Sequence, residues 1–534
     1  MRSLAIIALV TACSSSTPVG KLRFHNTAPV WRVDDQRPLN KPPDERDYNR
    51  TLYHADGYVF RRITRGMEFR PDVRAKDINS LGEVPDSTWF ENRIGVREYT
   101  LEELTRGPNG DESPFDNRPW TITGAKVGGM SVGFIFEDAK QRKFLLKFDE
   151  KAVPELETGA HAIVHRILWA VGYHVPQDYI GYIDRKDLIV GPKAQKKGFN
   201  DEKLEAALKL VWQDNGKIRV LASRFVPGKP IGPYAREGTR GDDPNDVIAH
   251  DERRSLRGQY AIFAWLNHTD LQEDNTIDAF DHGYVTHYLI DFGKALGVMG
   301  MSNKMATPGY QFRFDVGMAF QNLLTLGLVK QPYDGIREPG LRGIGLYDAK
   351  HYDPGTWRPS SIYYPLLSHD RFDAFWGAKL LIRFRPHELA AIVKEAQFSD
   401  PRSAAYMTET LILRQRATAR YWFDQVAPLD QFVVDDGGKL CFTDLTLSYK
   451  LRDTPTTYAI DTFDQGGISA GHEQELRATK NGRACAAVPL IGAADGYTIV
   501  RLRVRRDKHE MPPVVVHVAR DAAGVARVIG LRRR

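Results

Sequence analysis

The stretch His268-Thr-Asp-Leu-Gln-Glu-Asp-Asn275, with Leu289-Ile-Asp-Phe-Gly293 after it, is the part of the sequence that decides the fold. The first stretch follows the apolar end of a predicted helix and carries Asp270 and Asn275 five residues apart. A carboxylate that accepts a hydroxyl proton and an amide oxygen that binds a metal can converge from such a loop. Asp291 directly follows an apolar strand and could bind Mg²⁺, which prefers few carboxylates together with phosphate oxygens and water. Each piece taken alone is also compatible with a polar loop or a turn cap.

A glycine-rich stretch lies upstream, at Thr123-Gly-Ala-Lys-Val-Gly-Gly-Met-Ser-Val-Gly133, between two predicted strands. Glycines allow backbone N–H groups to approach phosphate oxygens closely. The candidate phosphate-binding positions are Gly124, Gly128 and Gly129. A glycine-rich hairpin can also be no more than a turn.

Lys147 lies inside the apolar strand predicted over 143–148, so its ammonium must either face solvent or find an anion. The next segment is predicted to be a helix from Glu155 to Val171, because its apolar residues recur with helical spacing. Glu157 on this helix could pair with Lys147 and aim it at phosphates, and Glu155 is the competing partner. His161 and His165 lie four residues apart, a spacing that can bind zinc. The metalloprotease pattern lacks its glutamate, so we interpret them as helix-face histidines.

Around these features the chain changes character three times. Residues 20–118 are rich in Pro, Asp, Arg and aromatic residues without clean periodicity, and Glu83 to Arg93 looks like an ordered loop with anchoring aromatics. We expect residues 14–118 to form a tether and an extension that wraps a domain. Residues 119–230 alternate as strands do, with strands predicted over 143–148 and 188–190. Residues 231–430 are mainly helical in pattern, with helices predicted over 251–266 and 401–425 and a short strand over 288–290. Residues 431–534 contain short β-runs separated by polar turns, which predicts a small β-sandwich-like domain.

The order of these motifs resembles that of protein kinases. HTDLQEDN resembles the kinase catalytic loop, Asp291-Phe-Gly293 matches the kinase DFG motif, and residues 144–176 look more like the HipA-like atypical kinases. The resemblance implies an α+β fold with a bilobal kinase-like domain: a β-rich N-lobe at 119–230 and a helical C-lobe at 231–430. It also implies Mg²⁺ with ATP or another nucleotide as the cofactor. The implied roles are phosphate contact for Lys147, support of that lysine for Glu157, base catalysis for Asp270, and metal binding for Asn275 and Asp291.

The sequence also departs from the kinase pattern. Thr269 replaces the arginine that usually contacts an activation-segment phosphate, Gln272 replaces a lysine or histidine, and no Ala-Pro-Glu follows Gly293. The favoured function is phosphoryl transfer from a nucleotide to an unknown protein or small molecule. The alternative is a non-catalytic, pseudokinase-type binding scaffold. This alternative carries weight because the first residues, described next, resemble those of exported lipoproteins, which normally meet little ATP.

The beginning of the sequence indicates export. One positive charge, a short apolar run and Val10-Thr-Ala-Cys13 resemble the signal peptide and lipobox of bacterial lipoproteins over residues 1–13. The resemblance implies that Cys13 is lipidated and holds the protein to the cell envelope. Ser14 after the cysteine does not suggest retention in the inner membrane, so the outer membrane is the favoured location.

Composition narrows the remaining possibilities. A net charge of +6 over 534 residues, without a concentrated basic and aromatic face, does not indicate nucleic-acid binding. The chain is too long for one compact core, so two or three domains are expected. Besides Cys13, only Cys441 and Cys485 are present. Outside the cytoplasm they could form a disulfide, or they could be two buried free thiols.

Overall fold

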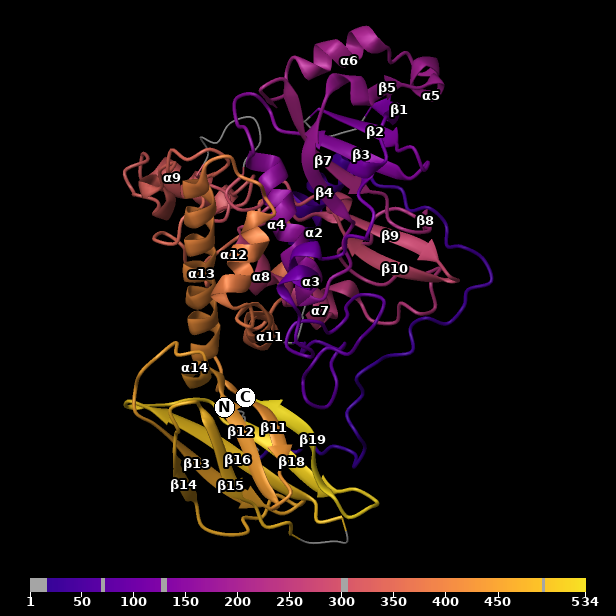
Figure 1. Cartoon of the computed structure of the whole chain (residues 1–534). Coiled ribbons are helices and arrows are strands. Elements are labelled where there is room, and N and C mark those ends of the chain that lie inside the picture. Colours follow the sequence, from indigo (N-terminus) through magenta and orange to yellow (C-terminus); the bar gives the residue numbers. More distant parts are fainter. Residues whose placement is uncertain (1–16, 69–72, 126–131, 299–305, 492–494) are drawn as a thin grey trace, which may run out of the picture. The chain divides into compact units, whose positions relative to one another are not determined.

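The computed structural model describes residues 17–68, 73–125, 132–298, 306–491 and 495–534. These residues form a mixed α+β structure with several sheets (Figure 1). They divide into two compact units. The first contains the described residues up to Pro29 with Ser80–Gly82 and Val426–Arg534, and the second contains Val30–Asn79 and Glu83–Gln425. The range 14–118, predicted as one wrapping extension, is therefore distributed over both units.

A seven-stranded sheet, counted over the described residues, dominates the first half of the second unit. Its order is β4-β7-β3-β2-β1-β5, with β6 paired to β7, and only the β1–β5 pairing is parallel. The strands are β1 (Trp120–Ala125), β2 (Gly133–Glu137), β3 (Lys143–Phe148), β4 (Asp178–Ile183), β5 (Leu188–Val190), β6 (Gln213–Asp214) and β7 (Lys217–Arg224).

Aromatic side chains hold the middle of this sheet together. Trp120, Phe136 and Phe144 come from three neighbouring strands and are fully buried, with ring centroids 4.3 and 5.1 Å apart along the stack. Large rings on facing strands stabilise the pairing register because a slip of one residue would turn each ring to the other face. This register places Gly133 opposite Lys147.

Helix α4 (Leu156–Val171) follows β3 and packs against β3, β4 and β7 on one side and α3 and α12 on another (Figure 1). All its residues except Glu157 and Trp169 are buried, because the helix lies between other elements instead of on the surface. Gly172 ends it with a φ of 137°, and a Cβ there would lie 2.4 Å from the carbonyl oxygen of Glu91. Only glycine fits this close approach.

The second half of the unit is mainly helical, and in Figure 1 the long helix α13 runs beside α12 and α8. Its helices are α7 (Arg254–Arg257), α8 (Gln259–Leu266), α9 (Val316–Leu324), α10 (Tyr364–Leu367), α11 (Arg371–Leu381), α12 (Pro386–Lys394) and α13 (Pro401–Asp424). Two short helices, α5 (Pro192–Lys196) and α6 (Asp201–Leu208), belong to the sheet region.

The single helix expected over 251–266 is instead divided into α7 and α8 at Gly258. A Cβ on Gly258 would lie 2.4 Å from the ring of Trp376, and one on Gly377 would lie 2.2 Å from the carbonyl oxygen of Gly258. These two glycines let α11 approach α8 at backbone distance. Helix α8 is buried on all sides, so it has no amphipathic face.

A small sheet contains β8 (Lys229–Pro230), β9 (Thr276–Asp281) and β10 (Tyr284–Leu289), and its β9–β10 hairpin joins the two motif stretches in the chain. The sequence predicted only one short strand, over 288–290, and missed the β9–β10 hairpin. Its two-residue turn has positive φ at both His282 and Gly283, 51° and 89°. Such primed turns match the twist of the flanking strands.

The second unit's extension is ordered by aromatic residues and short helices. Trp89 and Phe90 are buried, as expected of anchoring aromatics in a loop, and Trp89 stacks on His287 with ring centroids 3.5 Å apart. The short helices are α1 (Arg50–Ala55), α2 (Arg61–Met67) and α3 (Leu101–Arg106), and a π-helical turn joins α1 to α2.

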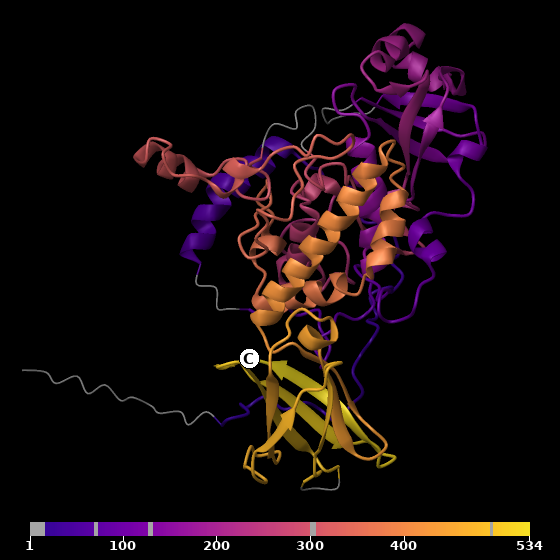
Figure 2. The ribbon, with the colours of Figure 1, turned by 60° about the vertical axis from the view of Figure 1, so that its left-hand side comes forward.

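The first unit contains two antiparallel sheets, β11-β12-β15 and β14-β13-β16-β18-β19, with β17 paired to β16 (Figure 2). Buried residues of both sheets form one hydrophobic core, as in a β-sandwich. The strands are β11 (Leu429–Val434), β12 (Lys439–Asp444), β13 (Thr456–Phe463), β14 (Gln474–Arg477), β15 (Arg483–Ala487), β16 (Thr498–Arg506), β17 (His509–Glu510), β18 (Val514–Arg520) and β19 (Ala526–Arg533); helix α14 (Leu445–Ser448) follows β12.

Two covalent or packing features complete this unit. Cys441 on β12 and Cys485 on β15 are direct cross-strand partners and form a disulfide, so of the two alternatives left by the sequence the bridge is confirmed. Val19 and Phe24, from the segment before Pro29, join a second cluster on the other face of the larger sheet. A Cβ on Gly530 would lie 2.1 Å from the Phe24 ring, so this glycine makes room for it.

Candidate active site

An ion pair between Lys147 and Asp291 forms the centre of the candidate site. Lys147 Nζ lies 2.7 Å from Asp291 Oδ1, and the lysine side chain is 4% exposed. Although burial alone lowers it, the Asp291 carboxylate raises the pKa of Lys147 above its ordinary value. For Asp291 the effects have the opposite signs: burial raises its pKa, but the charge of Lys147 holds that pKa well below its ordinary value. Both groups are therefore charged, and the strand lysine has found its anion.

The backbone at Asp291 explains why this carboxylate turns toward β3. Asp291 has a φ of 60°, in the left-handed region that aspartate tolerates better than most residues. The next residue, Phe292, is fully buried, and a Cβ on Gly293 would lie 2.5 Å from Cγ of Glu157. The D-F-G sequence thus supplies a carboxylate, an apolar anchor and a residue without a side chain where the loop meets α4.

Glu157, expected to hold Lys147, instead pairs with Lys294, with 3.2 Å between Nζ and Oε2. The cause is the close passage of Gly293 over Glu157, which brings Lys294 within reach of that carboxylate. The competing candidate, Glu155, lies at the helix N-terminus and accepts a hydrogen bond from the backbone of Ser399. Neither glutamate has the expected contact with Lys147 in the structure.

His161, which the sequence indicated to be only a helix-face histidine, is the second partner of Lys147 among the described residues. Its Nε2 lies 2.9 Å from Lys147 Nζ, and its Nδ1 lies 3.2 Å from Asp178 Oδ2. It occupies the same face of α4 as Glu157, one turn later. The sequence contained a signal for this role, because His161 lies four positions after Glu157 and so can reach the same partner from the same face of the helix. His165, the other histidine of the pair, is buried and hydrogen-bonds only the backbone oxygen of His161 among described residues.

The loop that carries Asp270 is fixed at several points. Asn267 ends α8 in the left-handed conformation and accepts a hydrogen bond from the indole of Trp357. His268 is buried between the rings of Phe263 and Phe292, and burial lowers its pKa to about 4, so it is neutral. Leu271 is fully buried. The loop therefore has little freedom to move its carboxylate.

Asp270 and Asn275 face the end of β10. The Asn275 side-chain amide donates to the backbone oxygen of Asp270, and the Asn275 backbone carbonyl accepts from the backbone N–H of Ile290, 3.0 Å away. Asn275 is thus joined to the residue before Asp291. The structure brings Asp270, Asn275, Asp291 and Lys147 together from three separate parts of the chain.

The environment of Asp270 differs from that of Asp291. Burial, and then the charge of Asp291, raise the pKa of Asp270 to about 6. The nearest cationic group among described residues is Arg313, at 3.6 Å from Oδ1, and this arginine was not identified from the sequence. Two neighbouring carboxylates with pKa values moved in opposite directions are the usual arrangement for a base beside an electrostatic ligand.

The donor set fits a divalent cation of the magnesium class. Asp270 Oδ1 and Asp274 Oδ1 are buried and have no hydrogen-bond donor within the described part of the chain. Together with Asp291 and Asn275 they offer oxygen atoms, the ligand type that Mg²⁺ prefers. In the described part of the chain, the ligand atoms of Asp270, Asp274 and Asp291 do not all lie within 4.8 Å of one another, whereas those of Glu157, His161 and Asp291 do. That second set contains a nitrogen, and Lys147 already contacts two of its members.

The glycine-rich stretch is described only in part. Gly124 lies in β1, where the pairing with β2 shifts register, and a Cβ there would meet only the tip of Lys197 at 3.9 Å. Gly128 and Gly129 lie outside the described residues, as does Cys13. Gly133 lies directly opposite Lys147 in the pairing of β2 with β3.

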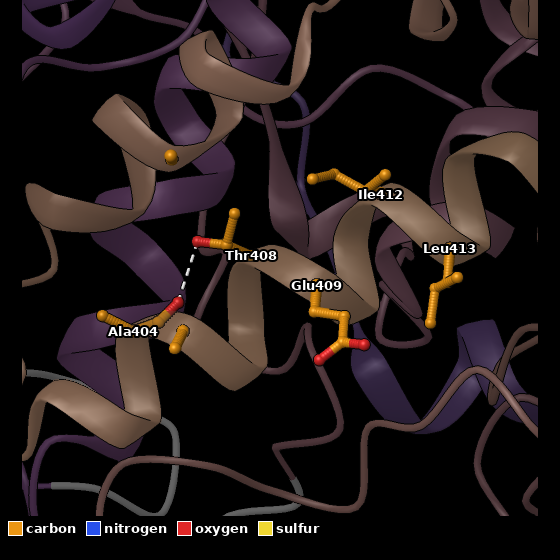
Figure 3. A pocket seen from close by; sticks show the side chains of 7 residues that line it. Ala404, Thr408, Glu409, Ile412 and Leu413 are labelled. Atoms are coloured by element: carbon orange, nitrogen blue, oxygen red, sulfur yellow. Dashed lines mark hydrogen bonds between the residues drawn. The ribbon is translucent and has the colours of Figure 1, made fainter.

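A separate groove of about 470 Å³ lies on α12 and α13 (Figure 3). It is lined by Ala390, Ala404, Ala405, Thr408, Glu409, Ile412 and Leu413. In Figure 3 the Thr408 hydroxyl donates to the backbone oxygen of Ala404, 2.8 Å away, and so turns back onto its own helix. None of the candidate active-site residues lines this groove, so we do not assign it to the chemistry.

The comparisons with known proteins give weak likenesses. No family model matches the sequence, and no curated protein matches it. A proinflammatory kinase of Helicobacter pylori, CtkA, superposes with a TM-score of 0.32 at 10% identity, covering 57% of this chain and 96% of that one. The Golgi casein kinase with Mn/ADP bound superposes with a TM-score of 0.30 at 10% identity, covering 63% of this chain and 83% of that one. At these TM-scores neither likeness establishes a shared fold.

Proposed function

We propose that this protein catalyses Mg²⁺-dependent phosphoryl transfer from a nucleotide. The observation that carries the proposal is the convergence of a buried, charged lysine with two carboxylates whose pKa values move in opposite directions. Phosphoryl transfer needs little covalent chemistry from the protein, so it depends on positioning and charge neutralisation. Lys147, Asp291, Asn275 and Asp270 supply the groups for both.

Each residue has a distinct task in this mechanism. Lys147 donates to the phosphate oxygens, while Asp291 and Asn275 would hold the metal. When bound, Mg²⁺ would neutralise charge on the phosphates. Asp270 accepts the proton of the acceptor hydroxyl, and a pKa of about 6 leaves it mostly ionised and still basic near neutral pH. The glycines of 124–133 would contribute backbone N–H groups to the phosphates.

Lys147 must change partners when a nucleotide binds. In the protein alone Lys147 is paired with Asp291, the proposed metal ligand. If Asp291 held a metal, the ammonium would be available to a phosphate while Lys147 stays in place on β3. Asp291 is 37% exposed, which leaves one side of the carboxylate open to an incoming ligand.

The alternative is a binding scaffold without catalysis. The observation that favours it is the same ion pair, because Lys147 is already compensated by Asp291 in the protein alone. A scaffold would still bind nucleotide or another anion here, and it would not transfer phosphate. Fold and site composition alone do not distinguish these two functions.

We also propose that the protein acts in the cell envelope, anchored through lipidated Cys13. The support is the sequence pattern over residues 1–13. The Cys441–Cys485 disulfide agrees with an oxidising compartment. No helix of the described residues is long and apolar enough to cross a bilayer. We favour the outer over the inner membrane because Ser14 follows Cys13.

Two measurements on the purified chain lacking residues 1–13 test the function. Melting temperature is recorded with ATP and other nucleotides, each with Mg²⁺ and with EDTA. Transfer of labelled γ-phosphate to the protein itself and to envelope extracts is then followed. Metal-dependent stabilisation together with transfer supports the enzyme, and stabilisation without transfer supports the scaffold. The absence of any nucleotide effect would contradict the enzyme and a scaffold that binds nucleotide.

A further inference from the structure

The ammonium of Lys147 is held by an unusual pair of partners. An ammonium has three donors and no acceptor, so any group that contacts it must accept a hydrogen bond. Among the described residues these groups are Asp291 Oδ1 at 2.7 Å and His161 Nε2 at 2.9 Å. His161 Nε2 also lies 3.4 Å from Asp291 Oδ1, so the lysine hydrogens lie between two acceptors.

This contact assigns the roles of the two ring nitrogens of His161. Because an ammonium can only donate, Nε2 accepts from Lys147, which leaves Nδ1 as the nitrogen that can donate. Nδ1 lies 3.2 Å from Asp178 Oδ2, at the start of β4, and can donate to it. Although burial raises it, the hydrogen bond with His161 brings the pKa of Asp178 below its ordinary value. A buried carboxylate thus orients the ring.

We propose that His161, oriented by Asp178, is the positioning residue that holds Lys147 toward the nucleotide phosphates. This inference rests on the proposed function. Glu157 does not perform the task, because its carboxylate is paired with Lys294. His161 and Asp178 are buried to 2% and 1% exposure, so the chain Lys147–His161–Asp178 is shielded from water along its length.

His161 differs from a glutamate in one respect. An accepting ring nitrogen orients the ammonium of Lys147 without placing a further negative charge against it. The charge balance comes from carboxylates: although burial lowers the pKa of Lys147, Asp291, Glu157 and Asp178 together raise it above its ordinary value. The imidazole therefore supplies direction, and the carboxylates supply the charge.

The test uses a matched set of variants on the same helix. His161→Ala removes the acceptor, and His161→Gln replaces Nε2 with an amide oxygen at similar reach. His165→Ala is the control, since it deletes another buried histidine one turn later that does not contact Lys147. Nucleotide Kd with Mg²⁺, kcat, and unfolding midpoints in urea are measured for all of them and for wild type.

We expect His161→Ala to weaken nucleotide binding roughly 10- to 100-fold, the usual effect of losing a hydrogen bond to a charged group. His161→Gln should restore most of that affinity. His165→Ala should lower the unfolding midpoint but leave nucleotide Kd within about twofold of wild type. In protein labelled with ¹⁵N-histidine, the imidazole signal lost in His161→Ala should show the Nδ1–H tautomer in wild type.

Three outcomes would overturn the inference. Nucleotide Kd unchanged in His161→Ala, or changed equally in His165→Ala, would show that His161 has only a structural role. Loss of Mn²⁺ affinity in nucleotide-free His161→Ala would make the imidazole a metal ligand instead of a partner of the lysine. Wild type that binds no nucleotide would overturn the proposed function as well, whereas the first two outcomes leave that function standing.

Discussion

Lys147 Nζ and Asp291 Oδ1 lie 2.7 Å apart although 144 positions separate them in the chain. One residue belongs to the third strand of a sheet, and the other follows a hairpin in the helical half of the same unit. The pair fixes the strand lysine relative to the loop that carries the proposed metal ligand. It also means that either residue, when changed, alters the charge balance around the other.

Asp291→Asn should abolish metal-dependent nucleotide binding, because the amide oxygen lacks the charge that binds Mg²⁺. It also leaves Lys147 buried without its counter-ion. Because Asp291 is partly exposed, we expect a destabilisation of roughly 1–3 kcal/mol, less than for a fully buried pair. Urea unfolding and nucleotide titration measure the two effects. Unchanged metal-dependent binding would remove Asp291 from the metal site.

Asp270→Asn should lower phosphate transfer by ~10²–10⁴-fold, the usual contribution of base catalysis, while nucleotide Kd changes little. The substitution keeps the size of the side chain and removes the charge that accepts the proton. Transfer of labelled γ-phosphate by wild type and variant gives the comparison. Equal rates would show that another group accepts the hydroxyl proton.

The same substitution should stabilise the metal-free protein in a pH-dependent way. Folding raises the pKa of Asp270 from 3.8 to about 6, so the folded state keeps its proton longer than the unfolded chain does. Wild type therefore loses stability as pH rises from about 4 through about 6. Asp270→Asn lacks this loss. The pH-dependent part of the difference in free energy of unfolding, variant minus wild type, should therefore be near zero at pH 4 and at most about 3 kcal/mol above pH 7. Denaturation in EDTA at several pH values measures it; a constant difference would contradict the raised pKa.

Removing the Cys441–Cys485 bridge should destabilise the unit formed around residues 426–534. The bridge closes a loop of 44 residues in sequence separation, and the chain-entropy relation gives about 4 kcal/mol for a loop of this length. Cys485→Ser in the full chain should therefore lower the urea midpoint of this unit. Thiol titration of unfolded wild type, without and with reductant, is the control. Two free thiols in protein isolated from the envelope would contradict the bridge.

Cys13→Ala should leave the protein without lipid and release it from membranes on fractionation, because the proposed acyl chains are its attachment. Mass spectrometry of the wild-type N-terminal peptide and the distribution of both forms between membrane and soluble fractions test this. Ser14→Ala, which keeps the cysteine, serves as the control. The lipoprotein interpretation would be excluded if wild type carries no lipid and Cys13→Ala remains in the membrane fraction to the same extent as wild type.

Local patterns predicted most of the regular elements. The strands over 143–148 and 188–190 have the predicted limits, and the long helix from Pro401 was expected at the correct position. These segments have clear periodicity and clear stop signals, which act over a few residues. The β9–β10 hairpin was missed because its turn depends on two left-handed residues, His282 and Gly283, and only the second is a typical turn signal.

The sequence by itself determined which residue types were available at the site: a strand lysine, a loop with Asp270 and Asn275, and the D-F-G turn. Only the tertiary structure decided which of them are partners. Glu157 and His161 share one face of α4, and both could reach β3. Gly293 packs closely against Glu157, so the Glu157 carboxylate pairs with Lys294. Asp178, the first residue of β4, hydrogen-bonds His161, whose other ring nitrogen contacts Lys147. Helical spacing defines a shared face within one segment, whereas the choice between two side chains on that face depends on packing against segments far away in the chain.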